Sequence, residues 1–314
     1  MDQEQSKEHT IGALFAIGAF VLWGIFPLYW NLLNNVPAEE VLAHRVVWCI
    51  VFMFIILLAL GKFKGFIEEV RELLSQPNQL VSIIIASLII SINWYLFIWS
   101  VNHEHVIEVS LGYYINPIVN VLLGVLILKE KLSFWQKVAV LLALIGVLHM
   151  TIQFGSIPWA ALGLAVSFAL YGLCKKMVKV GAITGLTIET LLMTPFALFF
   201  LFYLNQTGSS SFTSESPGHL LLLIGAGIAT AIPLLLFASG ARRISLSLIG
   251  FFQYIAPSLM LIIGVMLFHE TFTLVHLGSF LFIWSALFIF SLAKTKWFAK
   301  LEPKFLQKRK SFQG

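Results

Sequence analysis

The chain has 314 residues, of which 59% are hydrophobic and 11% are charged, with a formal net charge of +5 and a mean hydropathy of +0.92. Soluble domains need more charged residues than this to cover their surface. The composition therefore excludes a soluble protein and predicts a polytopic membrane protein. The positive charge does not call for nucleic acid as a partner, because basic loops also bind the anionic lipids of a membrane.

Apolar stretches recur along the whole chain. A helix needs about 20 mostly apolar residues to cross the hydrocarbon core of a bilayer. We therefore predict an all-α polytopic membrane protein with ten transmembrane helices, numbered here as spans 1 to 10. In chain order they cover residues 11–30, 39–60, 80–101, 107–128, 134–151, 159–177, 184–204, 219–240, 246–268 and 273–293. The length of the first stretch and the nine spans after it predict a helix there and not a cleaved signal peptide.

Two connecting segments have a character of their own. Residues 61–79 read GKFKGFIEEVRELLSQPNQ, which predicts an amphipathic helix on the membrane surface. Residues 207–218 read TGSSSFTSESPG, a composition that predicts a flexible linker.

The basic residues alternate from loop to loop. Nineteen of the 20 Lys and Arg residues lie in the two tails or at the loops that follow even-numbered spans, and Arg45 is the exception. The positive-inside rule then predicts that both termini are cytoplasmic in a multi-pass protein of the plasma membrane. The same residues predict that the basic loops and tail contact the anionic leaflet.

One segment occurs twice. Residues 114–124 read YINPIVNVLLG and residues 254–264 read YIAPSLMLIIG, and the two segments fall in spans 4 and 9. At an offset of 140 residues, the identical positions are Tyr114, Ile115, Pro117, Gly124, Val125 and Glu130, which match Tyr254, Ile255, Pro257, Gly264, Val265 and Glu270. The repeating unit is therefore five helices long, and an odd number of helices inverts the second unit in the membrane. Inverted repeats are typical of secondary transporters, which bind their solute between the two halves.

The repeat also sets the predicted organisation of the chain. It consists of a cytoplasmic tail at residues 1–10, a first five-helix repeat at 11–151, a second, inverted repeat at 159–293 and a basic cytoplasmic tail at 294–314. Pro117 and Pro257 interrupt the hydrogen bonding of their helices. We predict a kink at each, either around a central cavity or as plain packing.

Ionisable side chains inside a membrane are expensive and are therefore candidates for function. Arg45, Glu189 and Glu108 are placed in or at spans 2, 7 and 4, and His44 adjoins Arg45. Depth suggests an Arg45–Glu108 pair at one side, and at the other side Glu189 with Lys175 or Lys176. Such pairs would gate the two mouths, or Arg45 would hold an acidic group of the solute, or Glu189 or His44 would carry a proton. The alternative is a static ion pair that only fixes helix packing.

Aromatic and amide side chains in the middle of the spans form the second set of candidates. They suit a cavity for an amphipathic metabolite, because they offer apolar walls and a few oriented hydrogen bonds. Asn116 and Asn120 are one helical turn apart and are expected to face the same way. The full set is Asn93, Trp94, Tyr114, Asn116, Asn120, Tyr171, Gln253 and Tyr254.

Other chemistries find little support. The only aspartate is Asp2, and no GxxxxGK[ST] motif is present, so we expect neither aspartate-based catalysis nor an ATP-driven pump. Residues 103–105 read HEH, which lacks the spacing of a zinc motif. We expect no cofactor and no metal.

Several longer segments resemble one family. They are VPAEEVLAHRVVW from residue 36, NWYLFIWSVNHEHVIEVSLGYYINPIVNVLLGVLILKEKLSF from 93, ALYGLCKK from 169, GLTIETLL from 185 and GFFQYIAP from 250. Together they resemble the RarD subfamily of EamA-type permeases, in the drug/metabolite transporter superfamily, over residues 10–293. The resemblance implies a ten-helix carrier of the bacterial inner membrane built from inverted repeats. It does not imply a substrate.

These observations predict a secondary carrier for a small organic solute, such as an amino acid, a metabolite or a drug of the chloramphenicol type. An intramembrane enzyme that acts on lipid or prenyl substrates is one alternative, although the clustered acids or the Ser/His/Asp set it needs are not evident. A receptor or scaffold that transports nothing is another. Small residues spaced as at Gly225 and Ala229 would pack within one chain or between two chains, so a homodimer is possible.

Overall fold

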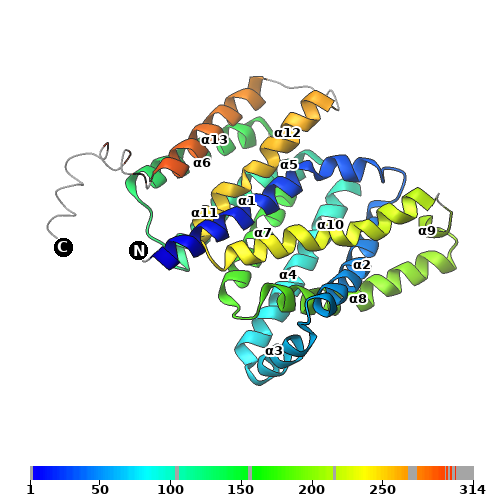
Figure 1. Cartoon of the computed structure of the whole chain (residues 1–314). Coiled ribbons are helices and arrows are strands. Elements are labelled where there is room, and N and C mark those ends of the chain that lie inside the picture. Colours follow the sequence, from blue (N-terminus) through cyan, green and yellow to red (C-terminus); the bar gives the residue numbers. More distant parts are fainter. Residues whose placement is uncertain are drawn as a thin grey trace.

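The computed structural model describes residues 3–102, 106–154, 158–214, 217–267 and 274–293, together with Thr295, Phe298 and Leu301. Helices are the only regular structure in this described part of the chain (Figure 1). They are α1 (Gln3–Asn31), α2 (Ala38–Ala59), α3 (Phe63–Ser75), α4 (Pro77–Asn102), α5 (Val106–Leu126), α6 (Phe134–Phe154), α7 (Trp159–Met177), α8 (Ala182–Gln206), α9 (Ser211–Ser214), α10 (Pro217–Ala241), α11 (Leu246–Gln253), α12 (Ile255–Leu267) and α13 (Leu274–Leu292).

Ten of these units have the character of membrane spans. Within the described residues, eight helical stretches are long and apolar enough to cross a membrane, with α11 and α12 together forming one of them. Two shorter apolar helices, Leu111–Leu126 and Leu277–Leu292, supply spans 4 and 10. The ten-helix prediction from the sequence is therefore confirmed, and α3 and α9 are additional short helices between spans.

The packing of the helices repeats in the two halves. The first repeat consists of α1, α2, α4, α5 and α6, and the second of α7, α8, α10, α11 with α12, and α13. The contact of α5 with α7 has its counterpart in that of α12 with α1, and the contact of α4 with α7 in that of α10 with α1. The pairs α2–α8, α5–α11 and α6–α13 each join a helix to its own counterpart, and Figure 1 shows α6 and α13 side by side. The two repeats are thus interleaved and do not form separate lobes.

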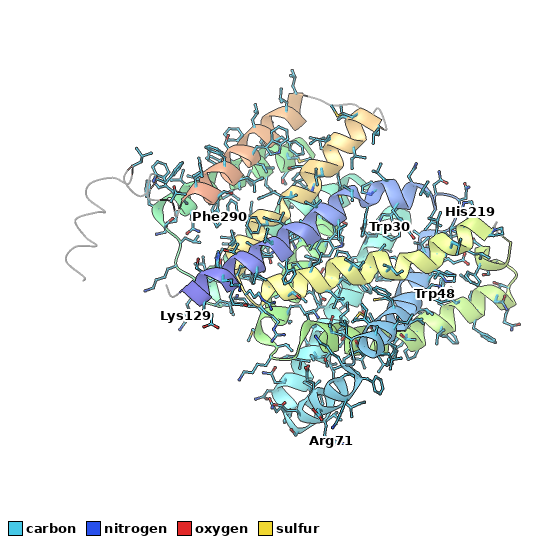
Figure 2. The ribbon with its side chains drawn as sticks, viewed as in Figure 1. Trp30, Trp48, Arg71, Lys129, His219 and Phe290 are labelled. Carbon is cyan, nitrogen blue, oxygen red and sulfur yellow. The ribbon has the colours of Figure 1, made fainter. Side chains whose placement is uncertain are left out.

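The bundle has two chemically different ends. The end at which α1 begins carries most of the described Lys and Arg residues and is called the basic end below. Figure 2 shows Lys129 near the beginning of α1, whereas Trp30 and His219 lie toward the opposite end. Helix α3 buries Phe66 and Leu73 and exposes most of its other side chains, so an amphipathic helix lies within the predicted segment 61–79, although it is shorter, and its place on the membrane surface stays a prediction.

Close helix crossings bring the two repeats together. A Cβ atom on Gly227 of α10 would lie only 2.3 Å from the carbonyl carbon of Trp48 in α2, so glycine is needed for this approach. Gly250 of α11 packs in the same way on the backbone of Pro117 in α5, where a Cβ would lie 2.7 Å from the proline carbonyl oxygen. Gly225 packs against the Tyr29 side chain of α1, so this small residue is used within the chain.

The repeated prolines have different local structures. Span 9 is interrupted at Tyr254, between α11 and α12, three residues before Pro257, and the kink expected at Pro257 stays a prediction. Proline has no N–H to donate to the carbonyl four residues earlier, and that residue is Gln253, where α11 ends. In span 4, by contrast, α5 runs through Pro117 without interruption.

Candidate functional site

The structure holds two groups of charged side chains inside the bundle. One contains Glu189 of α8 and the other contains Arg45 of α2. The two helices are repeat counterparts, and the charged residues occupy equivalent places in them, each seven residues after the first helical residue, Ala182 or Ala38. Inversion of the repeats therefore puts a negative charge toward the basic end and a positive charge toward the opposite end.

Glu189 forms a buried ion pair. Lys175 Nζ of α7 donates to Glu189 Oε1 over 2.6 Å, and the Tyr171 hydroxyl donates to Glu189 Oε2 over 3.0 Å. All three side chains are buried, and the Lys175 ammonium also lies 5.4 Å from the centre of the Tyr171 ring. The sequence predicted a pair of Glu189 with Lys175 or Lys176, and the partner is Lys175.

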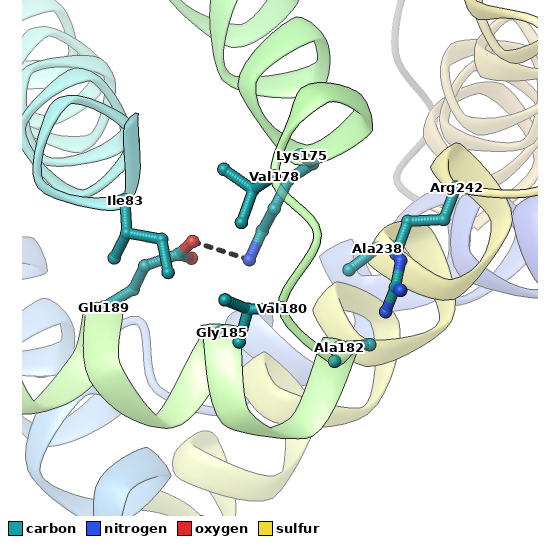
Figure 3. Close-up of a pocket in the computed structure, with 10 residues that line it drawn as sticks. Ile83, Lys175, Val178, Val180, Ala182, Gly185, Glu189, Ala238 and Arg242 are labelled. Atoms are coloured by element: carbon teal, nitrogen blue, oxygen red, sulfur yellow. Dashed lines mark hydrogen bonds and ion pairs between the residues drawn. The ribbon is translucent and has the colours of Figure 1, made fainter. Parts of the chain in front are cut away.

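A small pocket opens beside this ion pair (Figure 3). Glu189, Lys175 and Gly185 line it together with Arg242, and its volume is about 10 Å³. This is about the room that one water molecule requires. The pocket therefore has no room for an organic molecule in the conformation that the structure describes.

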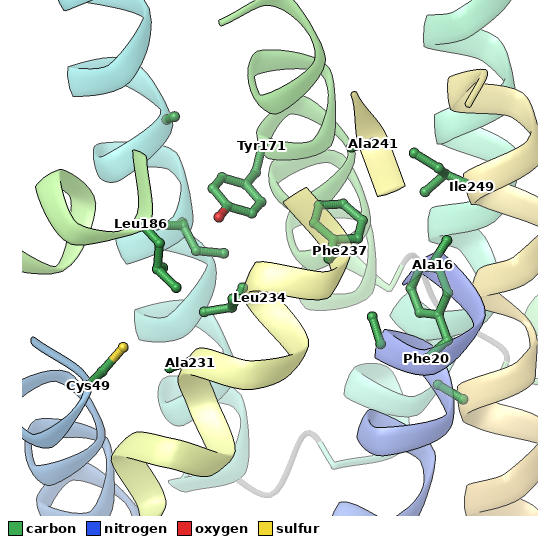
Figure 4. Packing of buried hydrophobic residues seen from close by; sticks show 14 of the residues in the cluster. Ala16, Phe20, Cys49, Tyr171, Leu186, Ala231, Leu234, Phe237, Ala241 and Ile249 are labelled. Carbon is green, nitrogen blue, oxygen red and sulfur yellow. The ribbon is translucent and has the colours of Figure 1, made fainter. Parts of the chain in front are cut away.

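Tyr171 connects the ion pair to the apolar core. Its ring is stacked on Phe237 of α10 at 6.1 Å between centroids, and Leu186 and Cys49 belong to the same buried cluster (Figure 4). Helices of both repeats contribute to this cluster, so any displacement of the Lys175–Glu189 pair also acts on their interface.

Lys176, the other predicted partner of Glu189, binds backbone carbonyl groups at the basic end. Its ammonium donates to the backbone carbonyls of Ile244 and Ala241, at 2.5 and 3.3 Å, and so covers the last turn of α10. A cation at the carboxyl end of a helix is favoured by the unpaired carbonyls and the helix dipole. Lys176 therefore helps to close the basic end.

Arg45 lies in an aromatic setting toward the opposite end. Its Nε donates to Thr230 Oγ1 of α10 over 2.9 Å. The guanidinium carbon is 4.9 Å from the ring centre of Trp30 in α1 and 5.8 Å from that of Trp94 in α4. Arg45 is thus contacted by three helices besides its own, α1, α4 and α10, which come from both repeats.

Glu108, which the sequence suggested as the partner of Arg45, lies in the first turn of α5. Its side chain, like residues 103–105 with their HEH motif, is outside the part of the chain that the structure describes. Among the described residues, no group of three or more His, Cys, Asp or Glu side chains is arranged to hold a metal ion.

Sequence reasoning missed Glu40. This carboxylate is fully buried and accepts hydrogen bonds from the Ser210 hydroxyl at 3.1 Å, from the Ser211 N–H at 2.8 and 3.0 Å, and from the Phe212 N–H at 3.3 Å. It therefore fixes the start of α9, and the segment predicted as a flexible linker is packed at this point. His44 lies next to it, stacked on Phe212 at 4.8 Å with Nε2 3.9 Å from Glu40 Oε1.

The predicted amide residues form a chain of hydrogen bonds between helices. Asn120 Nδ2 donates to Asn116 Oδ1 at 2.9 Å and to Gln253 Oε1 at 2.8 Å, so Asn116 and Asn120 do face the same way. Asn116 donates to the Ala165 carbonyl of α7. Asn93 donates at 3.0 and 2.8 Å to the Leu164 carbonyl and the Ser167 hydroxyl of the same helix. These amides cross-link the two repeats.

Tyr114 and Tyr254 are buried in a second apolar cluster. The Tyr114 ring packs edge to face on Phe280 of α13 at 5.3 Å, and the Tyr254 hydroxyl has no hydrogen-bond partner among the described residues. A role in solute binding stays a prediction for both tyrosines.

The repeated glutamate has a clear structural function in its first copy. Glu130 folds back over Gly124 and accepts hydrogen bonds from the N–H groups of Leu246 and Ser247, at 2.7 and 3.0 Å, and from the Ser247 hydroxyl at 2.7 Å. It thereby caps α11 of the other repeat. Its counterpart Glu270 is outside the described residues.

Ten apolar helices in two interleaved repeats, with charged side chains held inside the bundle, define a multi-pass membrane transporter. The EamA-like transporter family matches residues 10–152 and again 156–292. The chain therefore belongs to the EamA-like transporter family, and its relatives place it in the RarD subfamily.

Three curated relatives illustrate the similarity. The chain is 46% identical to an uncharacterized transporter, YojE, of Bacillus subtilis (strain 168), over 93% of this chain and 97% of that protein. It is 43% identical to Protein RarD of Escherichia coli (strain K12), over 92% and 96% of the two chains. The chloramphenicol-sensitive protein RarD of Pseudomonas aeruginosa is 29% identical, over 88% and 92%. A solved crystal structure with 18% identity has a TM-score of 0.68 over 90% of this chain and 97% of the other, so it shares the fold.

Proposed function

We propose that this protein is a secondary carrier of the bacterial inner membrane that moves a small organic solute by alternating access between its two repeats. The observation that carries the proposal is the placement of Arg45 and Glu189 at equivalent positions of inverted helices, toward opposite ends of one bundle. Buried charge is costly in a membrane protein, and two such charges at the two mouths are typical of a solute path.

The solute class is small, organic and amphipathic. Aromatic side chains lie near Arg45, some bacterial relatives of this chain are named uncharacterized transporters, and another relative is named a chloramphenicol-sensitive protein. An amino acid, a metabolite or a drug of the chloramphenicol type fits these walls. The positive-inside rule places the basic end in the cytoplasm together with both termini, where its Lys and Arg residues lie against anionic lipid.

In this mechanism the Lys175–Glu189 pair closes the cytoplasmic mouth. Because the pocket beside it holds about one water molecule, the pair must separate before a solute passes. The Tyr171 ring links the pair to Phe237 of α10, and Thr230 of that same helix binds Arg45. Movement of α10 would thus change the contacts at both mouths together.

Counterflow in liposomes tests the proposal. The purified protein is reconstituted in vesicles loaded with an unlabelled solute, and accumulation of the labelled solute is followed for a panel of amino acids and for chloramphenicol. The test variant combines Glu189→Gln with Arg45→Ala. The matched control combines Glu8→Gln with Arg243→Gln, which removes an exposed ion pair of 2.9 Å at the basic end.

We expect counterflow of a chemically unmodified solute by the wild type and by the control, and its loss in the test variant. If the test variant still transports the solute, Arg45 and Glu189 contribute only to helix packing and not to transport. A modified product would show an enzyme, and no flux for any solute would favour a receptor or scaffold.

A further inference from the structure

The guanidinium of Arg45 has hydrogen-bonding capacity that its described neighbours leave unused. Arginine carries five N–H donors, and a guanidinium inside a protein is normally paired. Here the Nε–H donates to Thr230 Oγ1, and the described residues offer no acceptor to the two Nη groups. The Arg45 side chain is half-buried among the described residues.

The free donors are held in a fixed direction. Thr230 Oγ1 donates to the Ala226 carbonyl at 2.7 Å, which orients its lone pair toward the Arg45 Nε. The indole rings of Trp30 and Trp94 restrict the guanidinium further, through contacts of the kind that arginine makes with aromatic faces. A fork of N–H groups that is immobilised in this way loses little entropy when it binds a ligand.

Two neighbouring side chains on α2 also have polar atoms without a partner among the described residues. Trp48 Nε1 is a buried donor, and the two ring nitrogens of His44, of which one donates and one accepts in the neutral imidazole, are buried as well. At 100° per residue, His44, Arg45 and Trp48 leave the helix within an arc of about 100°. This side of α2 therefore holds several unpartnered polar atoms, most of which are donors.

The nearest acid on the same helix does not supply the missing acceptor. Glu40 is committed to Ser210, Ser211 and Phe212, and its carboxylate is fully buried by them. The excess of donors therefore calls for a ligand that brings its own acceptors. A planar carboxylate matches two parallel Nη–H donors, and the aromatic rings around them favour an apolar body.

We propose that Arg45 binds the carboxylate of a small amphipathic solute, whose apolar part lies against Trp30 and Trp94. This inference rests on the proposed carrier function, because it names the class of solute that the carrier takes. It also gives the buried positive charge a purpose, since the bound carboxylate neutralises it in a medium where an isolated charge is costly.

Binding measurements test this inference separately from transport. Isothermal titration of the purified protein in detergent at pH 7 compares three carboxylates with their uncharged primary amides. The carboxylates are 3-phenylpropionate, 4-methylpentanoate and N-acetylphenylalanine. We expect at least one of them to bind about tenfold or more tightly than its amide, because hydrogen bonds to charged groups contribute strongly to affinity.

Variants assign the preference to Arg45. Arg45→Gln is expected to abolish it and Arg45→Lys to restore it only in part, because lysine keeps the charge but loses the planar fork. Arg243→Gln removes an exposed arginine at the basic end and is expected to leave the preference unchanged. Size-exclusion profiles and helix content establish that each variant is folded.

The outcomes separate the inference from the proposed function. Equal affinity for every acid and its amide, or a preference that survives Arg45→Gln, would overturn the carboxylate site. So would a preference that appears only after Glu108→Gln, since Glu108 would then be the native partner of Arg45. Carboxylate binding without counterflow would support the site and refute the carrier. Counterflow of a solute by a protein that shows no preference for carboxylates would support the carrier and refute the carboxylate site.

Discussion

The buried Lys175–Glu189 pair allows a prediction in which the loss of stability depends on whether one partner or both partners are removed. The two charges are 2.6 Å apart, and both side chains are at most 6% exposed. At an effective dielectric constant of about 20, opposite unit charges at this separation attract each other by about 6 kcal/mol. Each ion lost several kcal/mol of hydration free energy when it was buried, so the net contribution of the intact pair to stability is small.

Removal of one partner gives a different result. Lys175→Met leaves a buried carboxylate without its cation, and Glu189→Gln leaves a buried ammonium without its anion. Each single change is expected to lower the free energy of unfolding by about 3–5 kcal/mol. The double variant removes both charges, and the glutamine still accepts the hydrogen bond from Tyr171. It is expected to lose only about 0–2 kcal/mol.

Steric trapping in detergent micelles measures these free energies as a double-mutant cycle. The exposed pair of Glu8 and Arg243 provides the control, because its atoms are 2.9 Å apart but its side chains are 56% and 34% exposed. There Glu8→Gln is expected to cost less than about 1 kcal/mol. If the losses at Lys175 and Glu189 simply add, or if they are as small as at the control pair, the reasoning from burial is wrong.

Two further predictions concern close packing and the segment around α9. A Cβ on Gly227 would lie 2.3 Å from the Trp48 carbonyl carbon, so Gly227→Ala is expected to lower the free energy of unfolding by about 1–3 kcal/mol. Gly65→Ala is the control, because no atom lies within 4 Å of the added Cβ, and it is expected to raise the free energy of unfolding by about 0.4–1 kcal/mol. If the two substitutions changed the free energy of unfolding in the same direction, the close crossing at Gly227 would be contradicted. Glu40→Gln weakens the acceptor of the Ser211 N–H, so hydrogen exchange of that amide should become about tenfold faster or more. Unchanged exchange would show that other contacts hold the start of α9.

Much of the fold follows from local pattern. Apolar stretches of spanning length fixed the ten helices, and the repeated segments at Tyr114 and Tyr254 revealed the five-helix unit. Depth in the membrane was enough to suggest Lys175 or Lys176 as a partner for Glu189, because a buried acid needs a cation at the same level, and only the packed structure distinguishes Lys175 as the partner.

The missed features depend on contacts between distant segments. Glu40 looked like an ordinary acid in the first turn of a span, whereas its ligands begin 170 residues later, at Ser210. Thr230 is one of many hydroxyl residues in apolar helices, and only the crossing of α10 with α2 brings it to Arg45. Glu130 was recognised as a mark of the repeat, but its function as the cap of α11 requires the interleaving of the halves.

The interruption of span 9 bears on how the two repeats would change conformation during transport. Helix α5 passes Tyr114 without interruption, whereas its counterpart is interrupted at the single residue Tyr254. If transport exchanges the conformations of the halves, the state that faces the other way has its break at Tyr114 and a continuous helix through Tyr254. Both copies carry proline three residues later, as such a break requires. Span 4 would then show the conformation that span 9 takes in the opposite-facing state, and span 9 the conformation that span 4 takes.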